Sequence, residues 1–414
     1  MSLFSKNALG IDISDSSIEM LELKEKGRAL RVVAYRRLEL PDGIVNNGRI
    51  VNQQLLISKL IETLSLPGYG NFSTKAAVVS LPESQTYIHL FRLPAVISSQ
   101  QLGEAIQYEA EETLPLFWDQ TAHDYQVVRK DKDNQDVLYV AGSNEIVHSY
   151  QRVVSGAGFE LEALEAESAS LARALVGNQA SEPVLIADIG ARTTILTIYD
   201  QQAVHFSENI QIGGRHISDA LAQTLSVPLA EAEALKKKSG LNSLPSAQAI
   251  EPWLLKIVEA ARKVMLNYKK NSGRQVSQII MCGGSSLLPG VVEHISKQLH
   301  VQAILGNPLS NMAPGDKVFN SQPPILFSTV IGLAKRGLDH VKLQVGINLL
   351  RHAKGKDAQS AKGGTKATQP KQAAATLGSN WIARNKRGLV MIGVFMVLVI
   401  AFGILYVVKM RPFG

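Results

Sequence analysis

The sequence predicts an α/β fold of two related lobes, followed by a linker and one membrane-spanning helix. The first observation is a strand–turn–strand pattern that occurs near the N-terminus and again in the middle of the chain. The second is an alternation of apolar strands with helices of 3.6-residue spacing, which is typical of layered α/β domains. The third is an uncharged apolar stretch near the C-terminus that is long enough to cross a membrane.

The composition indicates a globular protein with a large core. The chain has 414 residues, of which 45% are hydrophobic and 19% charged, and this length suggests two or three lobes. The formal charge is +7, and much of the excess lies near the C-terminus, so we interpret it as membrane-proximal charge and expect no nucleic-acid partner. Cys282 is the only cysteine, which excludes a disulfide framework and a thiolate metal site.

In the first half of the chain, continuous or alternating apolar residues predict strands, and apolar residues three and four apart predict helices. The expected strands are residues 7–14, 18–24, 29–40, 76–81 and 137–141. The expected helices are residues 51–64, 98–114, 146–157 and 163–175. Pro67, Pro115 and Gly158 end the first three of these helices, and Ser98 or Ser99 can cap the second.

The second half of the chain shows the same alternation. Strands are expected at residues 184–189, 194–199, 203–210 and 278–282, and helices at residues 216–225, 229–238, 252–268 and 289–299. Residues 351–380 are rich in Lys, Ala, Gly, Gln, Ser and Thr and have almost no large apolar side chain. Because such a segment cannot bury a core, it predicts a flexible, disordered linker.

The repeated pattern is ALGIDISDSSIEMLEL, from residue 8, and VLIADIGARTTILTIY, from residue 184. Each copy has an apolar strand, Asp-Ile with a small residue, a hydroxyl-rich turn and a second strand. Asp12 matches Asp188, and Ser17 matches Thr193. A duplicated hairpin with an acidic strand end implies two related lobes that face each other, which is the signature of the actin/Hsp70 ATPase fold.

The turns after the two aspartates have the composition of phosphate-binding loops. Gly and Ser let the chain turn sharply, so that backbone amides can cradle a phosphate. Asp12 and Asp188 would hold Mg²⁺ from opposite lobes through water. The residues expected to bind the nucleotide here are Ser14, Ser16, Ser17, Gly190, Arg192, Thr193 and Thr194. An Asp at a strand end is ordinarily a turn former, and it is the duplication that favours a binding site.

Further contacts with the nucleotide are expected from the second lobe. MCGGSSLLPG, residues 281–290, predicts a strand, a glycine turn that permits close backbone approach, and a helix. A tight turn without a ligand is the alternative. Glu233 and Lys236 lie three residues apart, on one face of a predicted helix, and could contact ribose and adenine. A solvated charged helix face is the alternative. The residues expected in these contacts are Gly213, Gly214, Glu233, Lys236, Gly283, Gly284 and Ser285.

Taken together, these motifs resemble the PilM family of type IV pilus assembly proteins over residues 8–340. The resemblance also rests on VVSLPESQTYIHLFRLP (78–94), LGEAIQYEAEETLP (102–115), residues 139–175, and DIGARTT, IQIGG, AEALK and CGGSSLLPG. It implies a two-lobed actin/Hsp70-like ATPase fold over residues 1–342, with an inserted small α+β subdomain at about 86–160 and a second lobe at about 182–340. Ser14 stands where glycine is usual in the family, and Glu19 where lysine is common.

The resemblance implies a cytoplasmic scaffold that binds ATP and Mg²⁺. The departures at Ser14 and Glu19, and the lack of a residue that positions an attacking water, predict little or no ATP hydrolysis. The scaffold's partners would be PilN- and PilO-type inner-membrane pilus proteins and, indirectly, the assembly motor ATPases, and a homo-oligomer is possible. A homologue from mannose-sensitive haemagglutinin (MSHA) pilus biogenesis and a GspL-like component of type II secretion are the alternatives. A sugar or acid kinase shares the fold, but no catalytic base can be placed in this sequence, and catalytic residues stay unassigned.

A transmembrane helix is expected at residues 389–408, which are uncharged and apolar on all faces. Twenty residues of helix span roughly 30 Å, the thickness of the hydrocarbon core. Arg384, Lys386, Arg387 and the lysines of the linker precede this stretch, so the positive-inside rule places the large domain in the cytoplasm. The expected location is therefore the inner membrane with a single pass, although PilM proteins normally lack such a span.

The segment 343–350 contains Ile347, Asn348, Leu349 and Leu350, which resemble the start of the PilN tail that PilM proteins bind. Arg351 stands where that tail usually has proline. The leucines can fill apolar pockets, and the Asn amide can pair with exposed backbone. We expect the chain to carry its own PilN-like peptide, bound in cis or by a neighbouring copy. A chance tetrapeptide at the start of a linker is the alternative.

Overall fold

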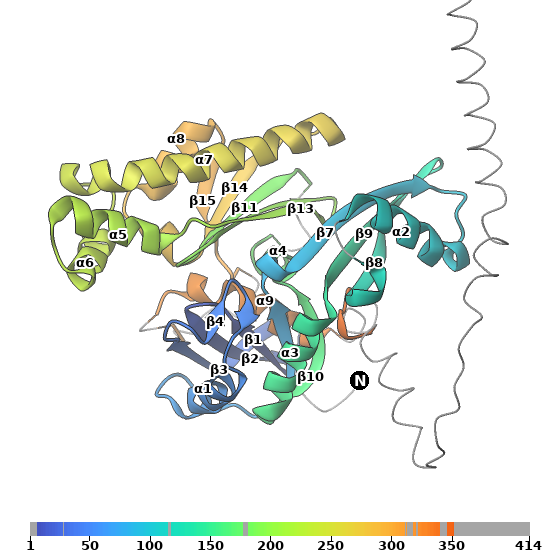
Figure 1. Cartoon of the computed structure of the whole chain (residues 1–414), viewed down its shortest axis with the longest axis horizontal. Helices are drawn as coiled ribbons and strands as arrows, with labels where there is room; N and C mark the ends of the chain where they lie inside the picture. The colour runs from blue at the N-terminus through green and yellow to red at the C-terminus, as the bar shows by residue number, and fades with distance from the viewer. Residues whose placement is uncertain are drawn as a thin grey trace, which may run out of the picture. The chain divides into compact units, whose positions relative to one another are not determined.

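The computed structural model builds three β-sheets of three or more strands, with their helices, before the predicted linker (Figure 1). The residues that it describes are 6–27, 29–114, 117–176, 181–310, 312, 318–319, 322–339 and 346–351. Two of the sheets have five strands each and form the two lobes, and the third has three strands.

The first lobe is built on a sheet of strand order β10-β6-β1-β2-β3. The strands β1 (Asn7–Ile13), β2 (Ser17–Lys26) and β3 (Ala29–Glu39) form an antiparallel meander, and β6 (Ala76–Leu81) and β10 (Glu160–Ala166) extend it in parallel. A short hairpin of β4 (Val45–Asn46) and β5 (Arg49–Ile50) follows the meander. The helices α1 (Gln53–Ser65) and α3 (Asn144–Gly156) share one apolar core with β1 and β6.

The second lobe repeats this topology, with strand order β13-β12-β11-β14-β15. Its strands are β11 (Val184–Ile189), β12 (Thr194–Asp200), β13 (Ala203–Ile210), β14 (Gln278–Cys282) and β15 (Gln302–Leu305). The strands β11, β12 and β13 form an antiparallel meander, and β14 and β15 extend it in parallel, as β6 and β10 do in the first lobe. The helices are α5 (Gly214–Leu225), α6 (Leu229–Ser239), α7 (Leu244–Ser272) and α8 (Val291–Leu299). The duplication predicted from two hairpins therefore extends to both whole sheets.

The third sheet, of strand order β7-β9-β8, is inserted in the sequence of the first lobe after β6. Its strands are β7 (Thr86–Pro94), β8 (Thr121–Lys130) and β9 (Asn134–Ser143), and α2 (Ser99–Thr113) packs against it through its own small core. Short 3-10 turns lie at η1 (Glu83–Gln85), η2 (Trp118–Gln120), η3 (Gly284–Leu287) and η4 (Pro324–Phe327). The chain returns to the first lobe through α3 and β10.

The helix α9 (Ser328–Leu338) packs against β1 and against α4 (Glu167–Leu175), on the face of the first sheet opposite α1 and α3. The contacts are close enough to require glycine. A Cβ atom on Gly10 would lie 2.2 Å from the carbonyl oxygen of Val330, and one on Gly332 would lie 2.0 Å from that of Ser170. Because α9 follows the second lobe in sequence, it carries the end of the described chain back to the first lobe.

Two sequence-based element predictions are wrong. Residues 163–175 were expected to form one helix, but β10 occupies residues up to Ala166 and α4 begins at Glu167. The residues of β10 pair with β6, and this tertiary partner overrides a local sequence rich in Ala, Leu and Glu. The helix expected at 252–268 is the longer α7, which contains Pro252 in its interior. The strands β4, β5, β8 and β15 and the helix α9 were not predicted, although α9 has apolar residues at helical spacing.

The predicted span at residues 389–408 lies outside the described residues, as does the predicted linker after Arg351. Among the residues that are described, no helix combines the length and the apolar character needed to cross a membrane. The transmembrane helix therefore stays a prediction.

Candidate functional site

A cleft of about 1130 Å³ lies between the first and second lobes. Its walls include the turn after β1, the turn after β11 and the glycine turn after β14. These are the three turns that the sequence singled out, and each follows an interior strand of its sheet. The volume lies slightly above the usual range of about 300–1,000 Å³ for small-molecule and cofactor sites.

The first two turns close with the same hydrogen bond. The N–H of Ser14 donates to the carbonyl oxygen of Ser17 at 2.9 Å, and the N–H of Gly190 donates to that of Thr193, also at 2.9 Å. Ser14 has a second role, because its Oγ accepts the N–H of Ser17 at 3.0 Å. The serine that replaces the usual glycine thus stabilises the first turn with its own side chain.

Acidic side chains gather in the cleft beside these turns. Removal from bulk water raises the pKa of Asp12 to about 6, and it raises that of Asp188 to about 7 with a further contribution from the charge of Asp12. The O–H of Ser80 donates to Asp12. Carboxylates with raised pKa values in a shared cavity favour a bound cation, which would offset their charge.

Two further acids, Glu83 and Glu167, line the same cleft and were missed by the sequence reasoning. Burial raises the pKa of Glu83 and raises that of Glu167 well above its ordinary value. Each follows the carboxyl end of a parallel strand, β6 or β10. Since such ends meet at one edge of a sheet, an acid just after the apolar run of β6 was a signal for Glu83, whereas Glu167 follows a strand that the local sequence does not mark.

Glu19, which stands where lysine is common, also faces the cleft. Burial raises its pKa to about 7 despite the guanidinium of Arg37, whose Nε lies 2.8 Å from Glu19 Oε1. The ion pair partly neutralises the acid.

The third turn requires glycine at Gly283. This residue has a φ of +79°, and a Cβ atom there would lie 2.2 Å from Asp188 Oδ1 and 2.6 Å from the carbonyl oxygen of Ile189. The turn is joined to the second one by Ser285, whose Oγ donates to the carbonyl oxygen of Gly190 at 3.2 Å. The end of β11 and the glycine turn after β14 are therefore too close together for a side chain at residue 283.

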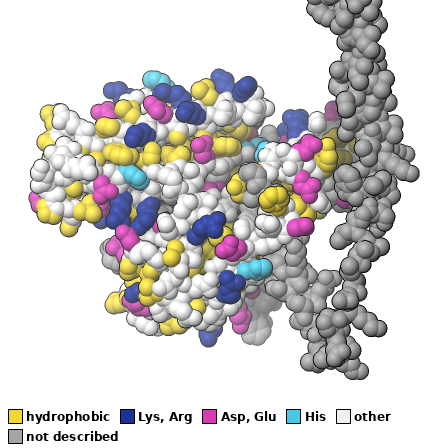
Figure 2. Space-filling view, viewed as in Figure 1, with side chains coloured by type: hydrophobic (Ala, Val, Ile, Leu, Met, Phe, Trp, Pro, Cys, Tyr) yellow, Lys and Arg dark blue, Asp and Glu magenta, His cyan; other side chains and the backbone are white. Residues whose placement is uncertain are grey.

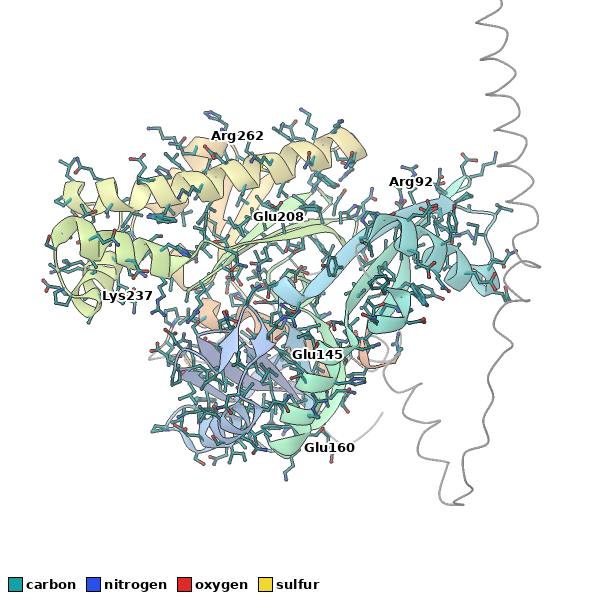
Figure 3. All side chains as sticks on the ribbon, in the orientation of Figure 1. Arg92, Glu145, Glu160, Glu208, Lys237 and Arg262 are labelled. Carbon is teal, nitrogen blue, oxygen red and sulfur yellow. The ribbon has the colours of Figure 1, made fainter. Side chains whose placement is uncertain are left out.

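On the second-lobe wall, Lys236 is buried and makes three polar contacts. Its Nζ donates to the carbonyl oxygen of Gly214 at 2.9 Å and to Ser218 Oγ at 2.8 Å, and it lies 2.6 Å from Glu233 Oε2. Lys237, which is labelled beside α6 in Figure 3, pairs with Glu233 at 3.2 Å. Glu233 and Lys236 thus hold α6 against α5 while facing the cleft.

Most of the predicted nucleotide-site residues line this cleft. They are Asp12, Ser14, Ser16, Ser17, Asp188, Gly190, Arg192, Thr193, Gly214, Glu233, Lys236, Gly283, Gly284 and Ser285. Two are not among its lining residues. The hydroxyl of the fully buried Thr194 donates to the carbonyl oxygen of Ile212 at 2.7 Å, and the N–H of Gly213 donates to His216 Nδ1 at 3.3 Å at the start of α5.

An ionic contact bridges the two lobes at the cleft. Asp42, in the loop after β3, pairs with Arg192 and Arg215 of the second lobe, the latter at 3.0 Å. The two guanidinium groups lower the pKa of Asp42. Elsewhere on the face shown in Figure 2, Lys and Arg side chains are interspersed with Asp and Glu.

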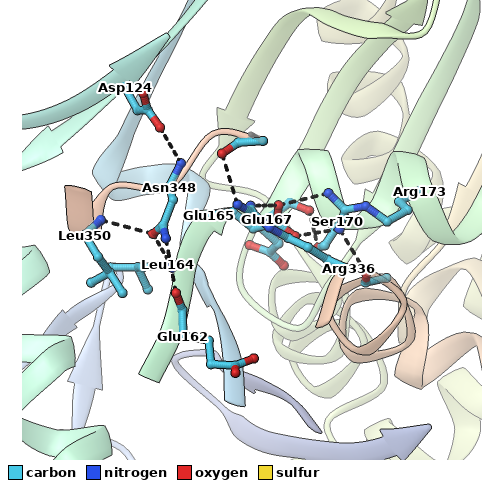
Figure 4. Close-up of polar contacts among 12 residues, drawn as sticks. Asp124, Glu162, Leu164, Glu165, Glu167, Ser170, Arg173, Arg336, Asn348 and Leu350 are labelled. Carbon is cyan, nitrogen blue, oxygen red and sulfur yellow. Dashed lines mark hydrogen bonds and ion pairs between the residues drawn. The ribbon is translucent and has the colours of Figure 1, made fainter. Parts of the chain in front are cut away.

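A second candidate site is the groove between β10 and β8, which holds residues 346–351 of the same chain (Figure 4). The amide of Asn348 pairs with the outer edge of β10: its Oδ1 accepts the N–H of Leu164 at 3.1 Å, and its Nδ2 donates to the carbonyl oxygen of Glu162 at 3.1 Å. The N–H of Leu349 donates to the carbonyl oxygen of Leu164 at 3.0 Å. The segment therefore covers the free edge of the first sheet.

Apolar and charged contacts complete this docking. Ile347, Leu349 and Leu350 are buried in the core of the first lobe, the two leucines at 0% and 1% exposure. On the β8 side, Asp124 Oδ2 accepts the N–H of Asn348 at 2.8 Å and Arg351 Nη1 at 2.7 Å. The predicted peptide motif is thus packed in cis.

A buried ion network lies behind the segment. Glu165 of β10 accepts from Arg173 Nη1 at 2.6 Å and also from the fully buried Arg336 of α9. Arg336 Nη2 in turn donates to the carbonyl oxygen of Gly346 at 3.3 Å. Burial alone would raise the pKa of Glu165, but the two guanidinium groups outweigh it and lower the pKa.

A family model described as type IV pilus assembly protein PilM matches residues 10–337. Among solved structures, a PilM–PilN type IV pilus biogenesis complex is similar with a TM-score of 0.71 and 22% identity, covering 80% of this chain and 98% of that one. The ethanolamine utilization protein EutJ of Carboxydothermus hydrogenoformans has a TM-score of 0.51 and 18% identity, covering 80% and 90%. The predicted actin-like ATPase fold is confirmed by these neighbours.

Similar sequences cover less of the chain. EutJ of Salmonella typhimurium is 30% identical over 139 residues, which are 34% of this chain and 45% of that protein. The cell division protein FtsA of Neisseria meningitidis serogroup B is 24% identical over 223 residues, or 48% and 53%. This chain therefore spans about half the length of these two relatives.

Proposed function

Because the chain belongs to the PilM family of type IV pilus assembly proteins, we propose that it is an ATP-binding scaffold of the pilus assembly platform at the inner membrane. Its partners are inner-membrane pilus proteins of the PilN and PilO type, and through them the assembly motors. The solved PilM–PilN complex supports the first of these partners.

Nucleotide binding between the lobes is supported by one observation above the others. The turns after β1 and β11 have the same backbone hydrogen bond and face the same cleft, each beside an aspartate. Backbone amides in two such turns can bind the oxygens of a polyphosphate from opposite sides. The glycine turn at Gly283 leaves room on the second lobe for the nucleoside.

Asp12 and Asp188 fit a Mg²⁺ ion that is held through water. Both carboxylates have raised pKa values, so a cation between them would stabilise their charged forms. Among the described residues no three acidic, His or Cys side chains are arranged to hold a metal directly, and Mg²⁺ commonly keeps several of its waters. The ion would neutralise phosphate charge, and we expect little hydrolysis.

Mg·ATP binding is tested with the Asp188→Ala variant. The wild-type chain in detergent should show a rise in melting temperature with Mg·ATP, and the variant a much smaller one. Asp133→Ala, on the exposed turn between β8 and β9, is the matched control and should respond like wild type. Absence of any shift in the wild-type chain would refute nucleotide binding.

We further propose that the groove between β10 and β8 is the site for a PilN-type peptide and that residues 346–351 supply this peptide in cis. Covalent linkage gives the segment an effective concentration of about millimolar, so an external peptide must compete with it. The substitutions Asn348→Ala and Leu349→Ala together define what we call the opened chain. It should bind a synthetic peptide of residues 343–352, whereas the wild-type chain should bind it much more weakly. Equal binding by both would contradict occupation in cis.

The chain is proposed to be anchored by residues 389–408, with the lobes in the cytoplasm. Deleting residues 381–414 should release the protein into the soluble fraction without a change in the melting temperature of the lobes. A truncated protein that still sediments with membranes would show that another surface provides the anchor.

A further inference from the structure

The contacts that hold residues 346–351 differ in how strongly they depend on the sequence of the peptide in the groove. The buried leucines contribute apolar area, and any pair of similar apolar side chains would do the same. The hydrogen bond from the N–H of Leu349 to Leu164 is a backbone contact that any extended peptide can make at a free strand edge. These contacts supply affinity but little selectivity.

The side chain of Asn348 is more selective. Its Oδ1 accepts two N–H groups, those of Leu164 and Leu350, while its Nδ2 donates to Glu162. A carboxylate in the same place could accept but could not donate, and an apolar side chain could do neither. Because these partners are buried or partly buried, an occupant without this amide leaves backbone groups unpaired.

One contact at the groove depends on the charge of a side chain of the occupant. Asp124 of β8 has a side chain that is 14% exposed, and its Oδ2 accepts both the N–H of Asn348 and Nη1 of Arg351. The N–H of Arg351 donates to the carbonyl oxygen of Asn348 at 3.1 Å, and this turn brings the guanidinium back over the backbone toward β8. The backbone N–H is common to all peptides, but the guanidinium is not.

The contact at the other end of the segment is to a backbone group and does not depend on a side chain of the occupant. Arg336 contacts the carbonyl oxygen of Gly346, a group that every peptide has. Arg336 and Arg173 share the single carboxylate of Glu165, so this network keeps a net positive charge, but its contact with the segment is to a backbone carbonyl oxygen. Of the contacts described above, the pair of Asp124 with Arg351 is the one that joins a charged side chain of the site to a charged side chain of the segment.

We propose that Asp124 is the specificity-determining residue of the groove, which selects a peptide with an apolar residue, Asn, two leucines and then a cation. This inference rests on the proposed function of the groove as a peptide site and names its preferred partner. The chain's own segment meets every requirement. A peptide with an acidic or neutral residue after the leucines leaves Asp124 with only the backbone N–H, so it competes less well with the segment already in the groove.

The first test uses the opened chain, full length in detergent, with labelled synthetic peptides of residues 343–352. One peptide keeps Arg351, one has Arg351→Glu, and one has Arg351→Pro. The Arg peptide should bind about tenfold more tightly than the Glu peptide at low salt, because attraction is exchanged for repulsion at a partly exposed site. The Pro peptide, which lacks both the cation and the N–H that donates to the Asn348 carbonyl oxygen, should also bind less tightly than the Arg peptide. The difference in affinity between the Arg and Glu peptides should shrink at 0.5 M NaCl.

The opened chain with Asp124→Lys should reverse the order and prefer the Glu peptide. The same protein is compared with two ligands, so partial unfolding cannot produce this reversal. The opened chain with Asp131→Lys is the matched control, since it makes the same charge change in the turn after β8, away from the segment, and should keep the original order. Equal binding of the Arg and Glu peptides overturns the specificity proposal alone. No binding of any peptide overturns the peptide site together with it.

A second test leaves the segment in place. Hydrogen exchange of residues 346–351 in the full chain should increase in Asp124→Lys and in Arg351→Glu, each of which creates a like-charge pair. The double variant Asp124→Lys/Arg351→Glu should regain part of the protection lost in Asp124→Lys, because the charge pair is rebuilt with its signs exchanged while the acceptor for the N–H of Asn348 stays absent. Protection that stays low in the double variant, or that never falls in the single ones, would show that the charge pair does not govern occupancy.

Discussion

The side chain of Asn348 takes the place of a neighbouring strand for Leu164. Its Oδ1 accepts the Leu164 N–H at 3.1 Å, and the next residue, Leu349, returns a hydrogen bond to the Leu164 carbonyl at 3.0 Å. β10 is the last strand of its sheet, so without this segment both groups would lie on an open edge. The described chain therefore ends by closing the edge of the first lobe.

Asn348→Asp should release the segment. The substitution keeps the shape of the side chain but removes the donor to Glu162, with an expected loss of about 1–2 kcal/mol for a partly buried carbonyl left unpaired. Hydrogen exchange of residues 346–351 should rise as a result. Asn144→Asp, which alters an exposed amide that donates to the carbonyl oxygen of Asp119 at 3.2 Å, is the matched control and should leave this exchange unchanged.

Gly283→Ala should destabilise the empty protein by about 1–3 kcal/mol, because the new Cβ would collide with Asp188 and the backbone would be strained at positive φ. Urea unfolding without nucleotide measures this loss. Gly284→Ala tests the interpretation, since the nearest atom to a Cβ there, Leu326 Cδ2, lies at 3.6 Å. Equal stability of the two variants would mean that the third turn is less tightly packed than the structure shows.

Glu165→Gln should reduce stability by about 3 kcal/mol near pH 7, because it leaves the charges of Arg173 and Arg336 without their counter-ion. The pKa of Glu165 is lowered on folding, so its ionised form contributes stability above its ordinary pKa of 4.5. That contribution is lost as the pH falls through this value toward the lower folded pKa.

The stability difference between wild type and Glu165→Gln should therefore narrow in acid. Thermal unfolding between pH 3 and pH 7 measures it. Glu160→Gln, at an exposed position of the same strand that Figure 3 labels, should follow the wild-type pH curve. A constant difference across this pH range would contradict the assignment of the lowered pKa to Glu165.

Asp42→Ala should loosen the contact between the lobes, because Arg192 and Arg215 both pair with this carboxylate across the cleft. Release of a fluorescent ATP analogue should become about threefold faster, a modest effect since the pair is exposed and screened by salt. Glu62→Ala removes an exposed ion pair that lies within α1 and should not change the release rate. Unchanged release in Asp42→Ala would show that the bridge does not limit opening.

The sequence alone determined the features that depend on residues close together in the chain. Asp12 and Asp188 each follow their own strand, and the hairpin that surrounds each is complete within sixteen residues, so the repeat and the two-lobed fold could be inferred from local patterns. The glycine turn at Gly283 was visible for the same reason. Thr194 and Gly213 were placed in the site only by their neighbours in sequence, and packing turned them to structural roles.

Tertiary structure decided what depends on contacts between distant residues. The pairing with β6 made residues up to Ala166 a strand instead of the first turn of a helix, because hydrogen bonds to a sheet outweigh a weak local helix preference. That strand end then placed Glu167 in the cleft. The partner of Asn348 and Arg351 is Asp124, more than two hundred residues earlier, and no local pattern can encode such a pair. It forms because α9 packs on β1 through Gly10, which returns the end of the described chain to the first lobe.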